Sequence, residues 1–210
     1  MGIMKKQKTA LIGLLLALSA LCTTSNAADG AKLYHANCAT CHGAEGEGGK
    51  GLALNRQSFL VVASDEYLVK SMLYGRPTRG CPPRNDLSKY ELVSIASFIK
   101  GWQKEKSVIV PNNRVQPYAS VRGKELFALC AGCHDEDGAG AMGPSLIDPG
   151  FQASASDGFI RGTIMLGRDG TPMAGFSKEA GHVAALSAED IDEVVAYMRY
   201  LGEEKEKGRH

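Results

Sequence analysis

Two short cysteine motifs constrain this chain more than any other feature of its sequence. They are CATCH at residues 38–42 and CAGCH at residues 130–134, and both have the form CxxCH. Two thiols three positions apart lie on one turn of helix, where each can form a thioether bond with one vinyl group of a porphyrin. The adjoining histidine can then bind the iron from the proximal side. The spacing therefore predicts covalent haem attachment at both places.

We expect the same division of roles in each motif. The attachment thiols are Cys38, Cys41, Cys130 and Cys133, and the proximal iron ligands are His42 and His134. The alternatives for a single CxxC are a thioredoxin-like redox pair and half of a zinc site. A redox pair does not require the histidine, and zinc would need ligands converging from both motifs. Two copies of the full motif therefore favour two haem c groups.

The two motifs belong to an internal repeat. Their first cysteines are 92 residues apart, and at the same offset Gly75-Arg76 matches Gly167-Arg168. Farther along, Leu87-Ser88 matches Leu186-Ser187 at an offset of 99, so the second copy holds seven extra residues. The chain therefore contains two copies of one structural unit.

Each copy ends in a segment with the apolar spacing of an amphipathic helix. Apolar residues recur at i, i+3, i+4 and i+7 in both segments: Leu92, Ile95, Ala96 and Ile99 in the first, and Ile191, Val194, Val195 and Met198 in the second. A serine with an acidic residue three positions later precedes each segment, which is the pattern of a helix N-terminus. With a helix leading into each motif and a middle helix after it, the sequence predicts an all-α fold of two tandem domains.

The N-terminal segment has the pattern of an export signal. Three lysines precede the apolar run Ala10–Leu21, and Ser25-Asn26-Ala27 supplies small residues at a cleavage site. The run is shorter than the ~20 residues that a membrane-spanning helix needs. We therefore expect a signal peptide at residues 1–27 and a periplasmic protein, for which membrane association is possible but not required.

Composition and proline content divide the rest of the chain. Residues 105–118 hold Pro111 and Pro117 and lack helical periodicity, so we expect a linker there. The first domain then covers 28–104, the second covers 119–203, and 204–210 form a charged tail. The whole chain has 24 Lys+Arg and 23 Asp+Glu, a net charge of +1. This balance argues against a nucleic-acid partner, which would require a basic excess.

Taken together, the motifs resemble those of bacterial dihaem cytochromes c built of two class I cytochrome c domains. The resemblance rests on CATCH and CAGCH, the lead-ins Gly30–Tyr34 and Gly123–Phe127, the loop GRDGTPMAGF and the two closing helices. It implies that each domain wraps around one covalent haem and that the chain transfers electrons between redox partner proteins. It also implies that the carbonyl of Pro144 orients the proximal histidine of the second domain.

The resemblance further implies that a methionine in the loop before the last helix is the distal iron ligand. In the second domain this residue is Met173. A packing role for Met173 is the alternative, and Met142, Met165 and Met198 are rival ligands. A thioether favours reduced iron and raises the potential, as an electron carrier requires.

The first domain departs from this pattern at its distal ligand. Cys81 falls on the position of Met173, which predicts His42/Cys81 ligation of the first iron. A bound thiolate would lower the potential of that haem. The alternatives are an inert buried thiol, an intermolecular disulfide, and replacement of Cys81 by Met72 as ligand.

A His/Cys haem also resembles those of thiosulfate dehydrogenases and Sox-type cytochromes. That resemblance implies a sulfur-oxyanion oxidoreductase with the His42/Cys81 haem as its active site. Arg76, Arg79 and Arg84 surround the cysteine and could attract an anionic substrate. The sequence favours electron transfer and keeps this enzymatic function as the alternative.

Overall fold

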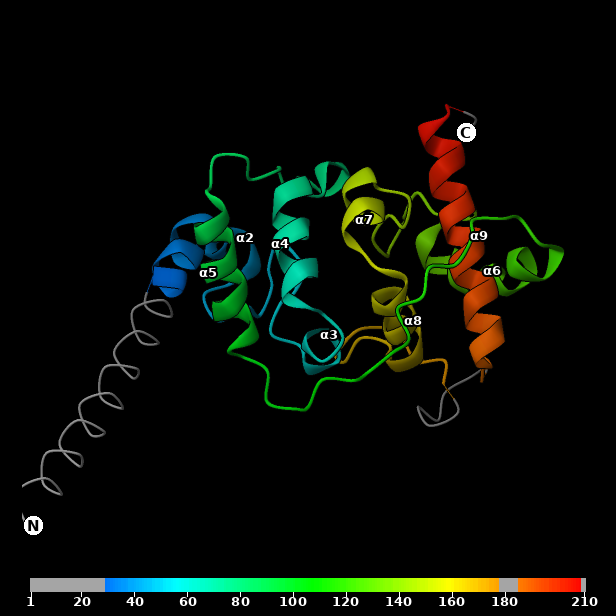
Figure 1. Ribbon diagram of the computed structural model, residues 1–210, viewed down its shortest axis with the longest axis horizontal. Coiled ribbons are helices and arrows are strands. Elements are labelled where there is room, and N and C mark those ends of the chain that lie inside the picture. The colour runs from blue at the N-terminus through cyan, green and yellow to red at the C-terminus, as the bar shows by residue number, and fades with distance from the viewer. Residues whose placement is uncertain (1–28, 178–184, 209–210) are drawn as a thin grey trace, which may run out of the picture.

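The computed structural model describes residues 29–177 and 185–208 (Figure 1). The expected signal peptide, residues 1–27, lies outside the described residues. Within them the regular structure is helical, apart from one isolated bridge between Arg76 and Cys81. The prediction of an all-α fold is confirmed. Among the described helices, none combines the length and apolar content needed to cross a membrane.

The helices of the two halves follow the same order. The first half contains a helix over residues 29–37, then α2 (Ala39–His42), α3 (Gln57–Leu60), α4 (Asp65–Tyr74), the 3-10 helix η1 (Pro77–Arg79) and α5 (Lys89–Lys100). The second half contains α6 (Val121–His134), α7 (Pro149–Ser154), α8 (Asp157–Leu166) and α9 (Ala188–Glu206). Helices α4 and α8 begin and end at positions 92 residues apart, which is the offset of the repeat. The helix α9 continues three residues beyond 203, into the segment expected to be a tail.

Both closing helices begin with the capping box that the sequence predicts. The side chain of Ser88 accepts from the backbone of Glu91 while the Glu91 carboxylate accepts from the backbone of Ser88. Ser187 and Asp190 form the same reciprocal pair at the start of α9. The predicted apolar faces are buried in both helices. Because each box satisfies free N–H groups of the first turn, the helix starts are fixed locally.

The lead-in helix of each domain crosses its closing helix at a glycine. A Cβ at Gly30 would lie 2.3 Å from the carbonyl oxygen of Ser94, and a Cβ at Gly123 would lie 2.8 Å from that of Glu193. The two backbones are therefore in contact, which only glycine permits. Gly30 and Gly123 are 93 residues apart, so the first domain holds one extra residue between its glycine and its motif, and the helix is interrupted at Cys38 (φ −126°, ψ −36°).

A basic side chain from each closing helix also holds the short helix of its own domain. Lys100 donates through Nζ to the carbonyl oxygen of Leu60 at 2.7 Å, and Arg199 donates through Nη1 to that of Gln152 at 3.0 Å. The two acceptors are again 92 residues apart. Each cation satisfies carbonyl groups at the C-terminal end of α3 or α7, where a positive charge is favourable.

The two domains pack together through equivalent elements. Helix α4 packs on α7, and α3 packs on α8, so each domain contributes its middle helix to the short helix of the other (Figure 1). At the centre, Tyr67 of α4 stacks on Phe159 of α8 with ring centroids 3.8 Å apart and an interplanar angle of 17°. These two rings are also 92 residues apart. The interface therefore relates the domains by an approximate two-fold axis that passes near this pair.

Two arginine contacts follow the same symmetry. Arg76 lies over the ring of Phe151 at 5.7 Å, and Arg168 lies over the ring of Phe59 at 5.6 Å. Exchanging the domains converts one contact into the other, because each pair of equivalent residues differs by 92. Both cation–π contacts cross between the domains and add to the apolar burial of the interface.

The segment expected to be a linker is extended and packs on the second domain. Arg161 of α8 donates through Nη1 to the carbonyl oxygens of Pro111 and Asn113, at 2.8 and 2.9 Å. The Asp157 carboxylate accepts from the backbone N–H of Val115 at 2.6 Å. Side chains of α8 therefore hold the connecting segment through hydrogen bonds to the backbone of residues 111–115.

Candidate haem-binding sites

Each histidine predicted as a proximal ligand is held by a backbone carbonyl at an equivalent position. His42 Nδ1 lies 2.7 Å from the carbonyl oxygen of Leu52, and His134 Nδ1 lies 2.8 Å from that of Pro144. A carbonyl oxygen only accepts, so Nδ1 carries the proton and Nε2 keeps its lone pair for iron. The expected role of the Pro144 carbonyl is what the structure shows. Leu52 makes the same contact because the backbone, and not a proline ring, supplies the acceptor.

A glycine packs directly against each of these imidazole rings. A Cβ at Gly51 would lie 2.7 Å from Cε1 of His42, and a Cβ at Gly143 would lie 2.8 Å from Cε1 of His134. The chain after each motif therefore passes close to the ring face, and any larger residue would push the ring away. The sequence analysis missed both glycines, although each follows its histidine by nine residues.

The thiols predicted to attach haem lie on one turn of backbone in each motif and are free of disulfides. In the first motif the N–H groups of Cys41 and His42 both donate to the carbonyl oxygen of Cys38, at 3.1 and 2.9 Å. In the second motif the thiols lie within the last turns of α6. Among the described cysteines, all five are unpaired. Thiols one turn apart and a histidine with its Nε2 available are the donor set that haem c requires.

Burial keeps the leading thiol of each motif protonated. It raises the pKa of Cys38 to about 11, with the nearby Cys81 thiol adding to the shift and Arg84 opposing it. Burial also raises the pKa of Cys130 to about 11. A redox-active CxxC pair instead has a thiol of lowered pKa. These thiols therefore lack the electrostatics of a thioredoxin-like site.

The second histidine sits in a drier environment than the first. His134 is buried, at 8% exposure, whereas His42 is half-buried. Burial lowers the pKa of His134, and the positive charge of Arg79 lowers it further, against the raising effect of the hydrogen bond to Pro144. A neutral imidazole is the form that binds a metal.

The two predicted distal ligands occupy equivalent places. The N–H of Arg76 donates to the carbonyl oxygen of Cys81 at 2.7 Å, and the N–H of Arg168 donates to that of Met173 at 2.8 Å. Both loops are thus closed by the same hydrogen bond, and both predicted ligands are half-buried. The structure places Cys81 where Met173 lies in the other domain. Iron binding by either residue stays a prediction.

The rival methionines lie in other settings. Met198 is 3% exposed and packs in the core of the second domain. Met142 is 73% exposed. Met165 and Met72 are half-buried and pack against the core cluster, which gives both a packing role.

The arginines around Cys81 are engaged by protein acceptors. Arg84 donates through Nε and Nη2 to the two carboxylate oxygens of Asp86, at 2.8 and 2.7 Å, and through Nη2 to Oδ1 of Asn37 at 2.6 Å. Arg76 donates to hydroxyl groups of both domains. Arg79 donates to the carbonyl oxygen of Gly143. Three cations close in sequence to Cys81 therefore serve the fold and the interface.

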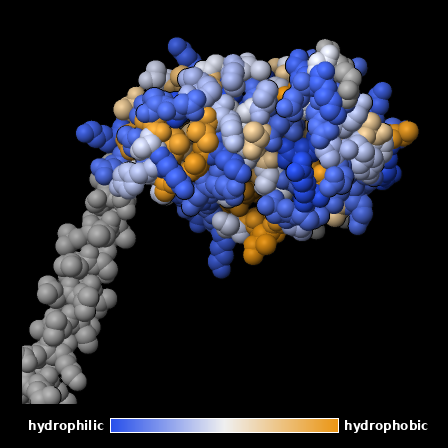
Figure 2. Space-filling model, turned by 45° about the horizontal axis from the view of Figure 1, so that its top comes forward, coloured by the Kyte–Doolittle hydropathy of each residue, from blue (hydrophilic) through white to orange (hydrophobic). Residues whose placement is uncertain are grey.

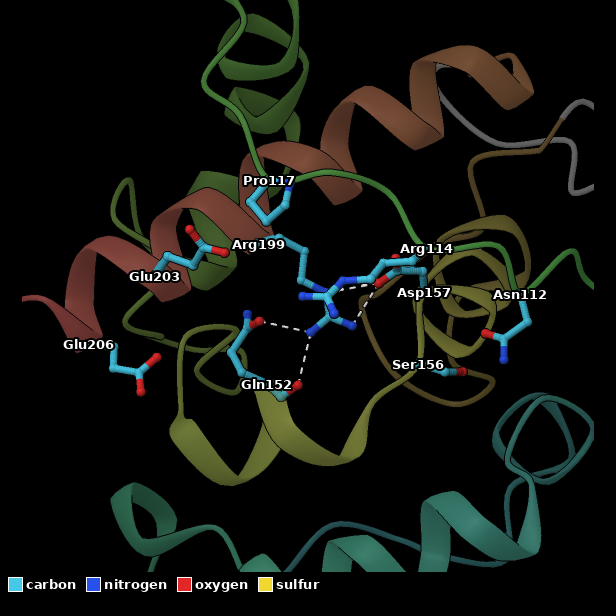
Figure 3. Close-up of a pocket in the computed structure, with 9 residues that line it drawn as sticks. All are labelled: Asn112, Arg114, Pro117, Gln152, Ser156, Asp157, Arg199, Glu203 and Glu206. Atoms are coloured by element: carbon cyan, nitrogen blue, oxygen red, sulfur yellow. Dashed lines mark hydrogen bonds and ion pairs between the residues drawn. The ribbon is translucent and has the colours of Figure 1, made fainter.

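A cavity of about 400 Å³ lies away from the motifs, between the linker, α7 and α9 (Figure 3). Figure 3 shows Arg199 pointing into the space between Gln152 and Asp157. Its Nε donates to the Asp157 carboxylate at 2.8 Å, and its Nη1 donates to the Gln152 side chain at 2.8 Å. The lining of the cavity contains none of the motif residues, and the Arg199 cation at its centre already has the Asp157 carboxylate as a partner. We therefore assign the functional chemistry to the CxxCH motifs.

Comparison with known proteins identifies both halves of the chain. Residues 25–99 match the family model described as cytochrome c oxidase, cbb3-type, subunit III, and residues 120–202 match the family model of cytochrome c. The chain is thus built of two tandem cytochrome c domains, which implies covalently bound haem c.

Two curated relatives are similar over much of the chain. A cbb3-type cytochrome c oxidase subunit FixP of Sinorhizobium medicae is 31% identical over 133 residues, which cover 57% of this chain and 43% of FixP. A cbb3-type cytochrome c oxidase subunit CcoP of Helicobacter pylori is 26% identical over 147 residues, which cover 67% and 49%. The chain therefore spans about half the length of these relatives.

A solved structure shares the fold. A chain of the reducing HAO-like protein complex of Kuenenia stuttgartiensis aligns with a TM-score of 0.54 at 20% identity. The alignment covers 82% of this chain and 95% of that chain. At this identity the likeness concerns the fold alone.

Proposed function

We propose that this chain of two tandem cytochrome c domains carries two haem c groups and transfers electrons between redox partner proteins. The observation that carries the proposal is the matched setting of His42 and His134. Each ring donates Nδ1–H to a carbonyl and faces a glycine at the same distance along the chain. Haem c supplies an iron that cycles between ferric and ferrous states without gaining or losing atoms.

The protein residues of the second domain suit a closed electron-transfer centre. The Pro144 carbonyl fixes the tautomer and orientation of His134. Met173 and His134 would together hold the iron of this domain, so we expect no substrate to bind at this metal. A neutral thioether favours the reduced state. This domain would therefore hold the electron at the higher potential.

The first domain would hold its electron at a lower potential. Cys81 would supply a thiolate in place of the thioether, and a thiolate favours the oxidised state. Arg84 lies close to Cys81 and is itself fixed by Asp86. The reduction potentials of the two centres would then differ within one chain, and the electron would pass from the first domain to the second.

The domain interface suits transfer between the two centres. The Tyr67–Phe159 stack and the Arg76 and Arg168 contacts hold the domains together at several points. A fixed separation keeps the distance for electron transfer constant. The interface thus supports internal transfer without domain movement.

The relatives suggest the class of partner. Both curated relatives are named as subunits of cbb3-type cytochrome c oxidases. We propose that an oxidase complex of this class is one redox partner of this chain, and that segment 1–27 directs the chain to the periplasm.

The alternative function, oxidation or reduction of a sulfur oxyanion at Cys81, gains no support from the arginines. Arg84 is bound by Asp86, and Arg79 is bound to Gly143 of the other domain. Both guanidiniums would have to leave these acceptors to bind a substrate anion.

One experiment separates the two functions. The purified holoprotein is mixed in stopped flow with thiosulfate or tetrathionate, and separately with a reduced small cytochrome c, while the haem absorption is followed. We expect rapid electron exchange with the cytochrome and no turnover of the sulfur compounds. Catalytic turnover that is lost in Cys81→Met and weakened in Arg84→Ala would instead establish the sulfur-oxyanion function.

A further inference from the structure

The tip of the first distal loop reaches into the second domain. The loop is closed by the backbone pairing of Arg76 with Cys81, and η1 (Pro77–Arg79) forms its tip. From this tip Thr78 donates through Oγ1 to the Asp148 carboxylate at 2.5 Å, and its N–H donates to the same oxygen at 3.3 Å. Arg79 donates through Nη2 to the carbonyl oxygens of Gly143 and Ala141. The tip therefore contacts the second domain at two places.

These two places bracket the segment that orients the second proximal histidine. Pro144, whose carbonyl accepts from His134, directly follows Gly143. Asp148 closes the segment as a buried carboxylate, 2% exposed, that also caps α7 by accepting from the N–H of Phe151 at 3.1 Å. One end of the segment is thus tied to Arg79 and the other to Thr78.

The contact that Arg79 makes has no counterpart in the reverse direction among the equivalent residues described. The position equivalent to Arg79 is Thr171, whose hydroxyl donates within its own loop to the carbonyl oxygen of Arg168 at 2.7 Å. The second loop meets the first domain through Asp169, which contacts Ser58 and Arg56. Arg56 is equivalent to Asp148, so the far end of the His42 segment is also held from the opposite loop. Among the described residues, the tie to the glycine backbone beside the histidine ring is therefore the part that runs in one direction only.

We propose that Arg79 is a positioning residue for His134: from the loop that carries Cys81 it fixes the Gly143–Pro144 backbone and places a positive charge beside the second haem. The inference rests on the proposed function only in taking His134 as an iron ligand. The fixed backbone keeps the imidazole in one orientation, and the charge favours the reduced state of the iron it binds.

The charge and the tether have different signatures. Arg79 is exposed, so its charge is partly screened and its influence falls as salt is added. The orientation of His134 by the tethered backbone does not depend on salt. Both parts together make Arg79 a residue of the first domain that tunes the centre of the second.

The test compares Arg79→Gln with Arg79→Lys and Arg122→Gln in the holoprotein. Arg122→Gln is the control for the loss of an exposed arginine charge, because Arg122 is an exposed residue of the second domain that pairs with Asp190 at the start of α9. The readouts are the midpoint potential of the second haem, at low and high salt, and its low-spin ferric signal in electron paramagnetic resonance. Haem content by mass is determined first for every variant.

We expect Arg79→Gln to lower the midpoint potential of the second haem and to shift its ferric signal. The potential change should shrink at high salt while the signal change stays. Arg79→Lys should restore the potential in part, and Arg122→Gln should leave both readouts unchanged. Unchanged readouts in Arg79→Gln, or equal changes in Arg122→Gln, would overturn the inference. Absence of haem on Cys130 and Cys133 in the parent protein would instead refute the proposed function.

Discussion

The close approach of Gly143 to the ring of His134 predicts that one added methyl group strongly lowers the stability of the fold. In Gly143→Ala the new Cβ would lie 2.8 Å from Cε1 and 2.9 Å from Nδ1 of His134, with the carbonyl oxygen of Cys133 at 3.0 Å on another side. Neither neighbour can yield easily, because the ring is held by Pro144 and the carbonyl belongs to α6. The ring must therefore move or the segment must shift.

The cost has two parts. Inserting a methyl group into a packed site costs about 1–3 kcal/mol. Loss of the hydrogen bond from Nδ1 to the Pro144 carbonyl, 2.8 Å long in the native protein, adds about 0.5–1.5 kcal/mol. We expect a total of about 1.5–4.5 kcal/mol. At a denaturant dependence of about 2 kcal/mol per molar urea, this lowers the midpoint of urea unfolding by roughly 1–2 M.

Gly132→Ala is the control within the same motif. A Cβ at Gly132 would meet nothing within 4 Å, and the residue lies in the last turns of α6. Alanine there should be neutral or stabilising by about 0.5–1 kcal/mol because glycine is a poor helix residue. Urea unfolding of both variants, followed by circular dichroism and by haem absorption, gives the comparison. Equal midpoints for Gly143→Ala and the parent would refute the assigned packing of His134.

Three further predictions follow from the interface and the ion pairs. A double-mutant cycle of Tyr67→Ala and Phe159→Ala, read by urea unfolding, should give a coupling of about 0.5–1.5 kcal/mol for the stacked pair, and a coupling near zero would remove the stack from the interface. Asp157→Asn should destabilise the fold by about 3 kcal/mol, since it leaves Arg199 without its buried carboxylate partner. Asp86→Asn should destabilise it much less, because the Asp86 carboxylate is exposed. Similar losses for the two variants, read by urea unfolding, would contradict this assignment. The hydrogen bond from Arg84 lowers the pKa of Asp86 from its ordinary value of 3.8 to about 2. The stabilisation from this pair is therefore complete above the ordinary pKa and is lost only as the pH falls through about 2. Nuclear magnetic resonance titration of the Asp86 carboxyl should show this midpoint, and in Arg84→Gln the pKa should return toward the ordinary value.

Much of the architecture could be predicted because it is encoded by local patterns. The CxxCH spacing and the two serine caps are short-range features, and both recur at the repeat. Each is found where the sequence places it. The short helices α3 and α7 were not predicted, since four and six residues hold too few turns to show a helical period. Their helical state depends on packing against the other domain.

The parts of the site that the sequence did not predict are those that depend on backbone atoms or on distant residues. Leu52 holds His42 through its carbonyl oxygen, and no side-chain pattern reveals a backbone acceptor. The contacts of Arg76 and Arg79 with the second domain need a fold to bring them together. One signal was present: Tyr67 and Phe159, like Phe59 and Phe151, are aromatic residues at the repeat offset, and they form the interface.

We propose two haem centres of different potential in one chain, one held by His42 and Cys81 and the other by His134 and Met173. The decisive measurement is a redox titration of the haem absorption of the intact holoprotein, with Cys81→Met in parallel. We expect two separate one-electron steps, with the lower step moving to higher potential in Cys81→Met and the upper step staying in place. A single step in the parent protein, or a lower step that Cys81→Met does not move, would contradict this proposal.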